Sequence, residues 1–160
     1  MDTVTVRGAR GDDHAWAAAL MSSSEPWITL RRDFDSCLRA CTSPSDVLEI
    51  ADAGGARCGL VLVRPAGVAG APYIVSIAVA ATHRSQGVGA AMLAHVEQAC
   101  RSRSRHLFLC VSSFNPRARR FYERYGFKVI GTLQDFIIEG ADEILMHKPL
   151  GHAGSPGSTG

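Results

Sequence analysis

The fold is decided by residues 76–89, which read SIAVAATHRSQGVG. Residues 76–80 are typical of a strand, and a helix is predicted from about Gly87 to Arg101. The first turn of a helix leaves backbone N–H groups without partners, and these groups and the helix dipole favour an anion. Arg84 adds a permanent charge with a fork suited to phosphate. The stretch therefore predicts a phosphate site between a strand and a helix.

Gly87 and Gly89 have two interpretations at this point. Without a Cβ they let a phosphate approach the backbone closely, but glycines also ease a tight turn between a strand and a helix. Two other phosphate motifs are set aside. A Walker loop requires Gly-Lys-Ser/Thr, which is absent, and a dinucleotide fingerprint requires a third glycine where Met92 stands.

A second motif occupies residues 115–127 and predicts a capped helix. Asn115 suits the N-cap and Pro116 the first helical position, while Gly126 suits a left-handed exit. Asn115 and Tyr122 are two turns apart, so both can point along one groove. Taken alone, Tyr122 would be a core aromatic with its hydroxyl at the rim.

The rest of the chain predicts a single domain over residues 1–150. Of the 160 residues, 46% are hydrophobic and 20% charged, which is typical of a globular protein. Hairpins precede strand–helix alternation, so we expect a mixed sheet flanked by helices. Strands are expected at 3–7, 47–51, 57–64, 73–80, 106–111, 128–138 and 143–148, a loop at 65–72, and helices at 15–20, 26–41, 87–101 and 116–125. Residues 151–160 are rich in Gly, Ser and Pro and are expected to form a disordered tail.

Together the two motifs resemble the GNAT (GCN-related N-acetyltransferase) superfamily. The matching patterns are Arg84-x-x-Gly87-x-Gly89 and Asn115-x-x-Ala118-x-x-x-Tyr122-x-x-x-Gly126-Phe127. Spacing, order and element types agree over residues 4–150. The resemblance implies an α/β (α+β) fold, with a mixed, mostly antiparallel central sheet of about 6–7 strands flanked by about four helices. It also implies an N-acetyltransferase that passes the acetyl group of acetyl-CoA directly to a primary amine of a small molecule or peptide, with no metal.

The resemblance assigns roles to individual residues. In this family the first motif holds the pyrophosphate of acetyl-CoA, the preceding strand pairs with the pantetheine, and the second motif contacts that arm. The cofactor-binding residues implied are Ile77, Ala78, Val79, Arg84, Gln86, Gly87, Val88, Gly89, Ala90, Asn115 and Arg119. Tyr122 would protonate the departing thiolate, because an unperturbed tyrosine with a pKa of about 10 is a proton donor at neutral pH. An amide near Val79 could stabilise the carbonyl oxygen as charge develops on it.

The acceptor would enter opposite the cofactor, near residues 22–27, Tyr73, 112–114 and 136–139. In this region Trp27 and Phe136 are alternatively core residues, and Glu25, Asp135 and Glu139 hint at a cationic amine. Residues 73–80 contain no Glu, Asp or His, so no general base is assigned. Glu25, Asp135 and His83 are candidates, and a water chain is the alternative.

Other functions stay open at this stage. A non-catalytic acyl-CoA-binding or regulatory domain of the same fold would bind acetyl-CoA without turnover. Arginines cluster at 101–105 and 117–124, but the net charge is only +2, and no nucleic-acid partner is expected. Cys37 and Cys41 lie one helical turn apart without a matching histidine, so we expect ordinary thiols and no metal. No leader-like N-terminus or apolar run of ~20 residues occurs, so we expect a cytoplasmic monomer or homodimer without membrane contact.

Overall fold

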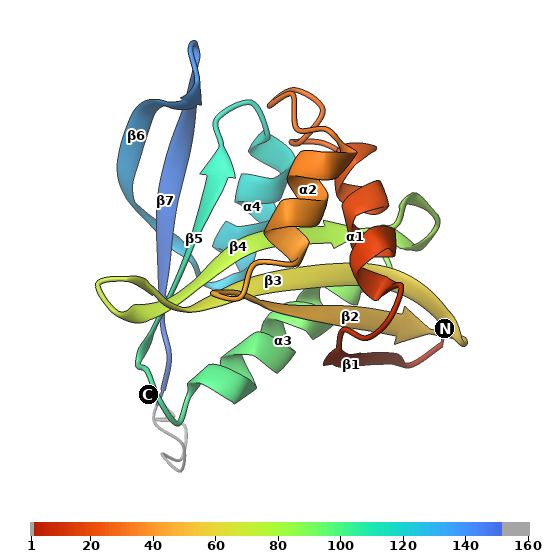
Figure 1. Ribbon diagram of the computed structural model, residues 1–160. Coiled ribbons are helices and arrows are strands. Elements are labelled where there is room, and N and C mark those ends of the chain that lie inside the picture. Colours follow the sequence, from red (N-terminus) through yellow and green to blue (C-terminus); the bar gives the residue numbers. More distant parts are fainter. Residues whose placement is uncertain (1, 152–160) are drawn as a thin grey trace.

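A computed structural model describes residues 2–151 (Figure 1). Its seven strands form one sheet in the order β1-β2-β3-β4-β5-β7-β6. All neighbouring strands are antiparallel except β4 and β5, which are parallel. The elements are β1 (Val4–Gly8), α1 (Asp13–Ser22), α2 (Phe34–Cys41), β2 (Val47–Ala53), β3 (Ala56–Val68), β4 (Ala71–Val79), the 3₁₀ helix η1 (Ala81–His83), α3 (Val88–Cys100), β5 (His106–Ser112), α4 (Pro116–Tyr125), β6 (Lys128–Ile138) and β7 (Ala141–Pro149). The predicted fold class is confirmed.

Helices cover both faces of the sheet (Figure 1). Alternate residues of β3 point to opposite faces, as the pleat of a strand requires. Leu60 and Leu62 pack in one core with residues of α1 and α2, whereas Val61 and Val63 pack in the other with α3 and α4. The sheet is therefore the middle of three layers, and both of its faces are buried where helices lie against it.

The second helix was predicted to begin at Pro26, and this start is wrong. Pro26 opens a single turn, closed by the bond from the Leu30 N–H to the Pro26 carbonyl oxygen. Arg31 then has a φ of 55°, which a right-handed helix does not accommodate. Helix α2 starts eight residues later, where the Asp33 carboxylate accepts a hydrogen bond from the Ser36 N–H at 2.8 Å.

The loop predicted for residues 65–72 is also wrong. Strand β3 continues to Val68 and β4 begins at Ala71, so the two strands form a hairpin with a two-residue turn. Ala69 and Gly70 in that turn have φ values of 49° and 82°. Positive φ at both positions matches the right-handed twist of the strands, which explains how so short a connection is possible. The boundaries predicted for α4 and β6 are confirmed.

The two middle strands separate partway along their length. Strand β4 pairs with β5 only at Tyr73 and Ile74 among the described residues. Its register with β3 shifts at the next residue, Val75, which is an extra residue in β4. A bulge of this kind bends the strand locally and disrupts the ladder. Beyond Ile74 the edge of β4 that faces β5 therefore lacks a strand partner within residues 2–151.

A buried carboxylate anchors the start of α1 to the sheet. Asp13 lies 2.6 Å from Arg7 and 3.1 Å from Arg57, and also accepts a hydrogen bond from the Arg10 N–H. The Arg7 guanidinium holds the pKa of the Asp13 carboxyl well below its usual range. Asp13 is the first residue of α1. Asp12 precedes the helix at the N-cap position, and its side chain forms no capping hydrogen bond.

Of the expected disordered tail, 151–160, all but Gly151 lies outside the described residues. Among residues 2–151, no helix combines the length and apolar character needed to cross a membrane.

Candidate active site

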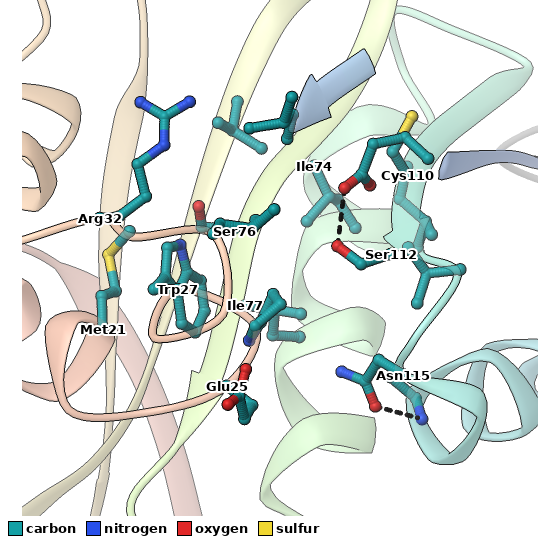
Figure 2. A pocket seen from close by; sticks show the side chains of 18 of the residues that line it. Met21, Glu25, Trp27, Arg32, Ile74, Ser76, Ile77, Cys110, Ser112 and Asn115 are labelled. Carbon is teal, nitrogen blue, oxygen red and sulfur yellow. Dashed lines mark hydrogen bonds between the residues drawn. The ribbon is translucent and has the colours of Figure 1, made fainter. Parts of the chain in front are cut away.

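A cavity of about 330 Å³ lies where β4 and β5 separate. One wall comes from the segment between α1 and α2, and the other from β5 and the start of α4. In Figure 2, Trp27, Arg32 and Glu25 lie on one side, Ser112 and Asn115 on the other, and Ser76 and Ile77 between them. The gap in the sheet thus brings together residues from both of its faces.

Three residues predicted to face the cofactor line this cavity: Ile77, Asn115 and Tyr122. The Asn115 side-chain oxygen accepts a hydrogen bond from the Ala118 N–H at 3.2 Å, which confirms its predicted place as N-cap of α4. Tyr122 is buried, and its hydroxyl forms no hydrogen bond with any of residues 2–151. Burial raises the pKa of Tyr122, so the hydroxyl keeps its proton at neutral pH.

The predicted phosphate stretch is an exposed loop that leads into α3. Gly87 is the residue before the helix, with a φ of 82° and no side-chain capping bond. The first helical hydrogen bond runs from the Ala91 N–H to the Gly87 oxygen, so the N–H groups of the first turn point outward as an anion site requires. Val88 is buried, whereas Gln86 and Gly87 are exposed.

The two glycines of this loop have different structural reasons. A Cβ added to Gly87 would meet nothing within 4 Å, so its left-handed φ explains the glycine. A Cβ added to Gly89 would lie 3.1 Å from Cζ of Phe121. Gly89 therefore allows α3 to approach α4 closely, a packing role that the sequence pattern did not separate from phosphate binding.

Two arginine side chains form hydrogen bonds at this loop, one from within the loop and one from α4. The Arg84 Nε donates to the Val79 carbonyl oxygen at 3.4 Å, and Arg117 Nη2 donates to the Ser85 hydroxyl at 3.4 Å. Arg119 instead pairs with Glu123, four residues on, at 2.8 Å. Arg117 is thus the α4 arginine that the structure places against the loop; from the sequence alone it was one of several in a basic cluster.

The other predicted cofactor residues lie along the end of β4. Val79 is half-buried, and Ala78 faces the opposite way, into the core beneath α1 and α2. Ala90 is half-buried in the first turn of α3. Neither Val79 nor Ala78 lines the cavity.

Several of the residues that were predicted to lie near an acceptor line the cavity. Glu25, Trp27, Tyr73, Ser112, Phe136 and Ile137 line it. Trp27 is 9% exposed and belongs to the core as well, whereas Phe136 is 63% exposed and is not a core residue. Two base candidates are not in the lining: Asp135 accepts a hydrogen bond from the Gly140 N–H in the β6–β7 turn, and His83 contacts Thr82 beside the exposed loop.

Sequence reasoning missed Glu143, a buried carboxylate in the cavity wall. The Ser112 hydroxyl donates to Glu143 Oε1 at 2.6 Å (Figure 2, dashed line at Ser112). Burial raises the pKa of Glu143, and the Ser112 hydrogen bond acts in the opposite direction. Glu143 begins the strand predicted at 143–148, but an acidic residue at a strand end gives no functional signal. Glu143 stands out only in the folded structure, where β5 and β7 pair and bring Ser112 opposite it.

Four of the five cysteines are buried thiols, and Cys110 is partly buried. Cys37 and Cys41 are both free, and the Cys41 Sγ lies 3.6 Å from the Met21 sulfur. Burial raises the pKa of Cys41 to about 11. Within residues 2–151, no three His, Cys, Asp or Glu side chains gather as metal ligands would.

Comparison with known proteins relates this arrangement to one family. The sequence matches the Acetyltransferase (GNAT) family over residues 13–127. It is 33% identical over 82 residues to N-alpha-acetyltransferase 50 of Danio rerio, a match that covers 49% of each chain. The chain spans about half the length of the curated relatives it matches.

Solved structures agree in fold. A GNAT-family acetyltransferase from Desulfovibrio desulfuricans has a TM-score of 0.80 at 23% identity, covering 93% of this chain and 100% of that chain. An aminoglycoside 6'-N-acetyltransferase complexed with coenzyme A has a TM-score of 0.75 at 15% identity, covering 94% and 99%. At these identities the structures establish the fold alone. The family match extends over most of the described residues, and the chain therefore belongs to the acetyltransferase (GNAT) family.

Proposed function

We propose that the protein is an acetyl-CoA-dependent N-acetyltransferase that transfers the acetyl group directly to a primary amine of a peptide or small molecule. One observation carries the proposal: a single cavity is lined by Tyr122 and Asn115 from α4 and by Glu25 and Trp27 from the opposite layer. Two substrates approaching through the gap between β4 and β5 would meet inside it. Direct transfer requires such a meeting point.

The residues present fit the expected cofactor. The first turn of α3, Arg84 and Arg117 surround an exposed loop with N–H groups and positive charge, which suits a pyrophosphate. The free edge of β4 beyond Ile74 offers main-chain groups to an extended amide-bearing chain. A solved structure of the same fold, an aminoglycoside 6'-N-acetyltransferase, is complexed with coenzyme A, which supports this choice of ligand. When bound, acetyl-CoA would supply the activated acyl group.

The chain's own residues then have defined tasks. Tyr122, which is protonated at neutral pH and whose pKa burial raises further, would donate its proton to the departing sulfur. A main-chain N–H on the free edge of β4 near Val79 would hold the carbonyl oxygen as negative charge develops on it. The Danio rerio relative is named N-alpha-acetyltransferase, so peptides with a free N-terminus are the first acceptors to test.

The test combines a binding and a turnover measurement. Acetyl-CoA at 100 times its Kd should stabilise the fold by about 2.7 kcal/mol, seen as a rise in melting temperature of about 5–10 °C. Release of free thiol from acetyl-CoA is then followed with free-N-terminal peptides, arylalkylamines, polyamines, aminoglycosides and amino acids. Absence of any melting shift at millimolar acetyl-CoA would contradict the whole proposal. A shift without thiol release from any amine would favour the alternative, a non-catalytic acyl-CoA-binding domain.

A further inference from the structure

A carboxylate without a cation lies in the wall of the cavity. Two carboxylates contribute to the lining, Glu25 and Glu143. Glu25 is exposed, and its oxygens already accept hydrogen bonds from the hydroxyl and N–H of Thr29. Glu143 is 5% exposed, and among residues 2–151 no lysine, arginine or histidine forms an ion pair with it.

The hydrogen bonding of Glu143 is incomplete. Its Oε1 accepts from Ser112, and no group within residues 2–151 donates to its Oε2. A buried carboxylate is costly unless it is paired with a cation or fully hydrogen-bonded. Because Glu143 borders a cavity, a ligand can supply the missing partner. An acceptor amine arrives mostly as an ammonium ion, which carries both the charge and the N–H donors required.

The position of Glu143 in the sheet directs it toward the acceptor side. Its neighbour on β7, Ile144, belongs to the core beneath α3 and α4, so Glu143 points to the opposite face. Ser112, its cross-strand partner, is the last residue of β5, the strand from which β4 has separated. The carboxylate thus lies beside the gap, on the face where α1 and α2 form the outer layer.

We propose that Glu143 binds the ammonium group of the acceptor and removes its proton, and that Ser112 is the positioning residue that fixes this carboxylate. The inference rests on the proposed acetyl transfer. It places the proton acceptor on β7, because β4 contains no carboxylate.

The proton balance of this step is complete. The ammonium passes one proton to Glu143, leaving a neutral amine and a carboxylic acid. The amine lone pair forms the nitrogen–carbon bond while the carbon–sulfur bond breaks. The sulfur takes the Tyr122 proton, and the second proton lost by nitrogen returns to Tyr122 through water. Glu143 then gives its proton to solvent, so the net products are an amide, a thiol and one proton.

The surroundings of Glu143 suit a proton acceptor. Tyr73 and Cys110, the titratable groups nearest to it on β4 and β5, both have a pKa raised by burial and remain neutral. Arg32 and Glu25 contribute opposite charges from the segment between α1 and α2. Burial also raises the pKa of Glu143 itself, which brings it closer to neutral pH, where a general base is most effective.

The first experiment needs no turnover. Protein with ¹³C-labelled glutamate carboxyls is titrated by NMR, and the Glu143 signal is identified by its loss in Glu143→Gln. Benzylamine, as its ammonium ion, should lower the pKa of Glu143 by about one unit, whereas the uncharged benzyl alcohol should not. Equal effects of the two probes, or no effect of either, would overturn the ammonium site even if acetyl transfer itself is established.

The second experiment uses the pH dependence of kcat/KM, with the acceptor that gives the fastest thiol release. Glu143→Gln should lower kcat/KM by about 10²-fold or more and abolish the limb that rises with pH through the Glu143 pKa. Ser112→Ala should move that limb to higher pH, because the Ser112 hydrogen bond lowers the Glu143 pKa. Asp35→Asn, an exposed position on α2, is the control and should leave the profile unchanged.

Both variants are checked for folding by the melting shift with acetyl-CoA, which neither should alter. A Glu143→Gln protein that binds acetyl-CoA normally and keeps the wild-type pH profile would remove Glu143 from the role of base. If Ser112→Ala lowers activity without moving the pH profile, Ser112 does not act through Glu143 and the positioning role is wrong.

Discussion

Replacement of Tyr122 by phenylalanine separates a chemical role from a structural one. The hydroxyl forms no hydrogen bond with residues 2–151, while the ring packs against Phe121 and Phe127 at centroid distances of 5.4 and 6.0 Å. Phenylalanine keeps these ring contacts, and no partner is left unsatisfied. The free energy of unfolding should therefore change by less than about 1 kcal/mol.

The same change should be costly for catalysis. Loss of the proton donor should lower kcat by roughly tenfold to a few hundredfold, which corresponds to about 1.4–3.4 kcal/mol of barrier. Thiol release under saturating substrates measures kcat, and urea denaturation measures stability. Tyr125→Phe is the matched control, because that hydroxyl is on the same helix but outside the cavity, with its ring against Lys148. An unchanged kcat in Tyr122→Phe, with an active acceptor, would refute the acid role.

Three further changes test other parts of the structure. Arg84→Ala should raise the Kd for acetyl-CoA about tenfold, measured by calorimetry, because one charged contact to phosphate is lost; an unaltered Kd would place the phosphate site elsewhere. Gly89→Ala should lower stability by about 1 kcal/mol, since its Cβ would crowd Phe121, and Phe121→Leu in the same protein should restore it. Asp13→Asn should destabilise by about 2 kcal/mol, less than loss of a fully buried pair, because both arginines are partly exposed.

The acid stability of the protein follows from the same aspartate. The folded-state pKa of Asp13 is depressed, so its contribution is fully present above the unfolded pKa of about 3.9 and is lost progressively as pH falls from that value through the lower folded-state pKa. The difference between the urea midpoints of wild type and Asp13→Asn should therefore be constant near pH 6 and smaller, though not zero, at pH 3. Midpoints that stay equally separated at pH 3 would contradict the assignment.

Much of the fold could be predicted where local chemistry and tertiary structure agree. Asn115, Pro116 and Gly126 mark both ends of α4, and the structure uses all three as expected. Helix α2 shows the opposite case. Its apolar spacing extends back to Leu30, but the left-handed φ of Arg31 interrupts the helix. An arginine side chain has no preference for that conformation, so the sequence could not predict the interruption.

Some residues of the candidate site could likewise be predicted from the sequence, and others could not. Asn115 and Tyr122, which lie on a helix with clear end signals, line one cavity, as their two-turn spacing allowed. Glu143 could not be found, because its significance depends on a cross-strand neighbour 31 positions away and on a cavity formed by other segments. Gly89 shows a subtler limit: a glycine required for contact between helices looks the same in sequence as one required for a ligand.

The separation of β4 from β5 also has a mechanical consequence. Within residues 2–151, strand pairing joins the first four strands of the sheet to the last three at only two residue pairs, so the hydrogen-bonded sheet is nearly divided between β4 and β5. A ligand that hydrogen-bonds to β4 and packs on β5 would bridge this gap. Binding of such a ligand should slow amide hydrogen exchange along residues 76–79 and 110–112, the strand segments on either side of the gap.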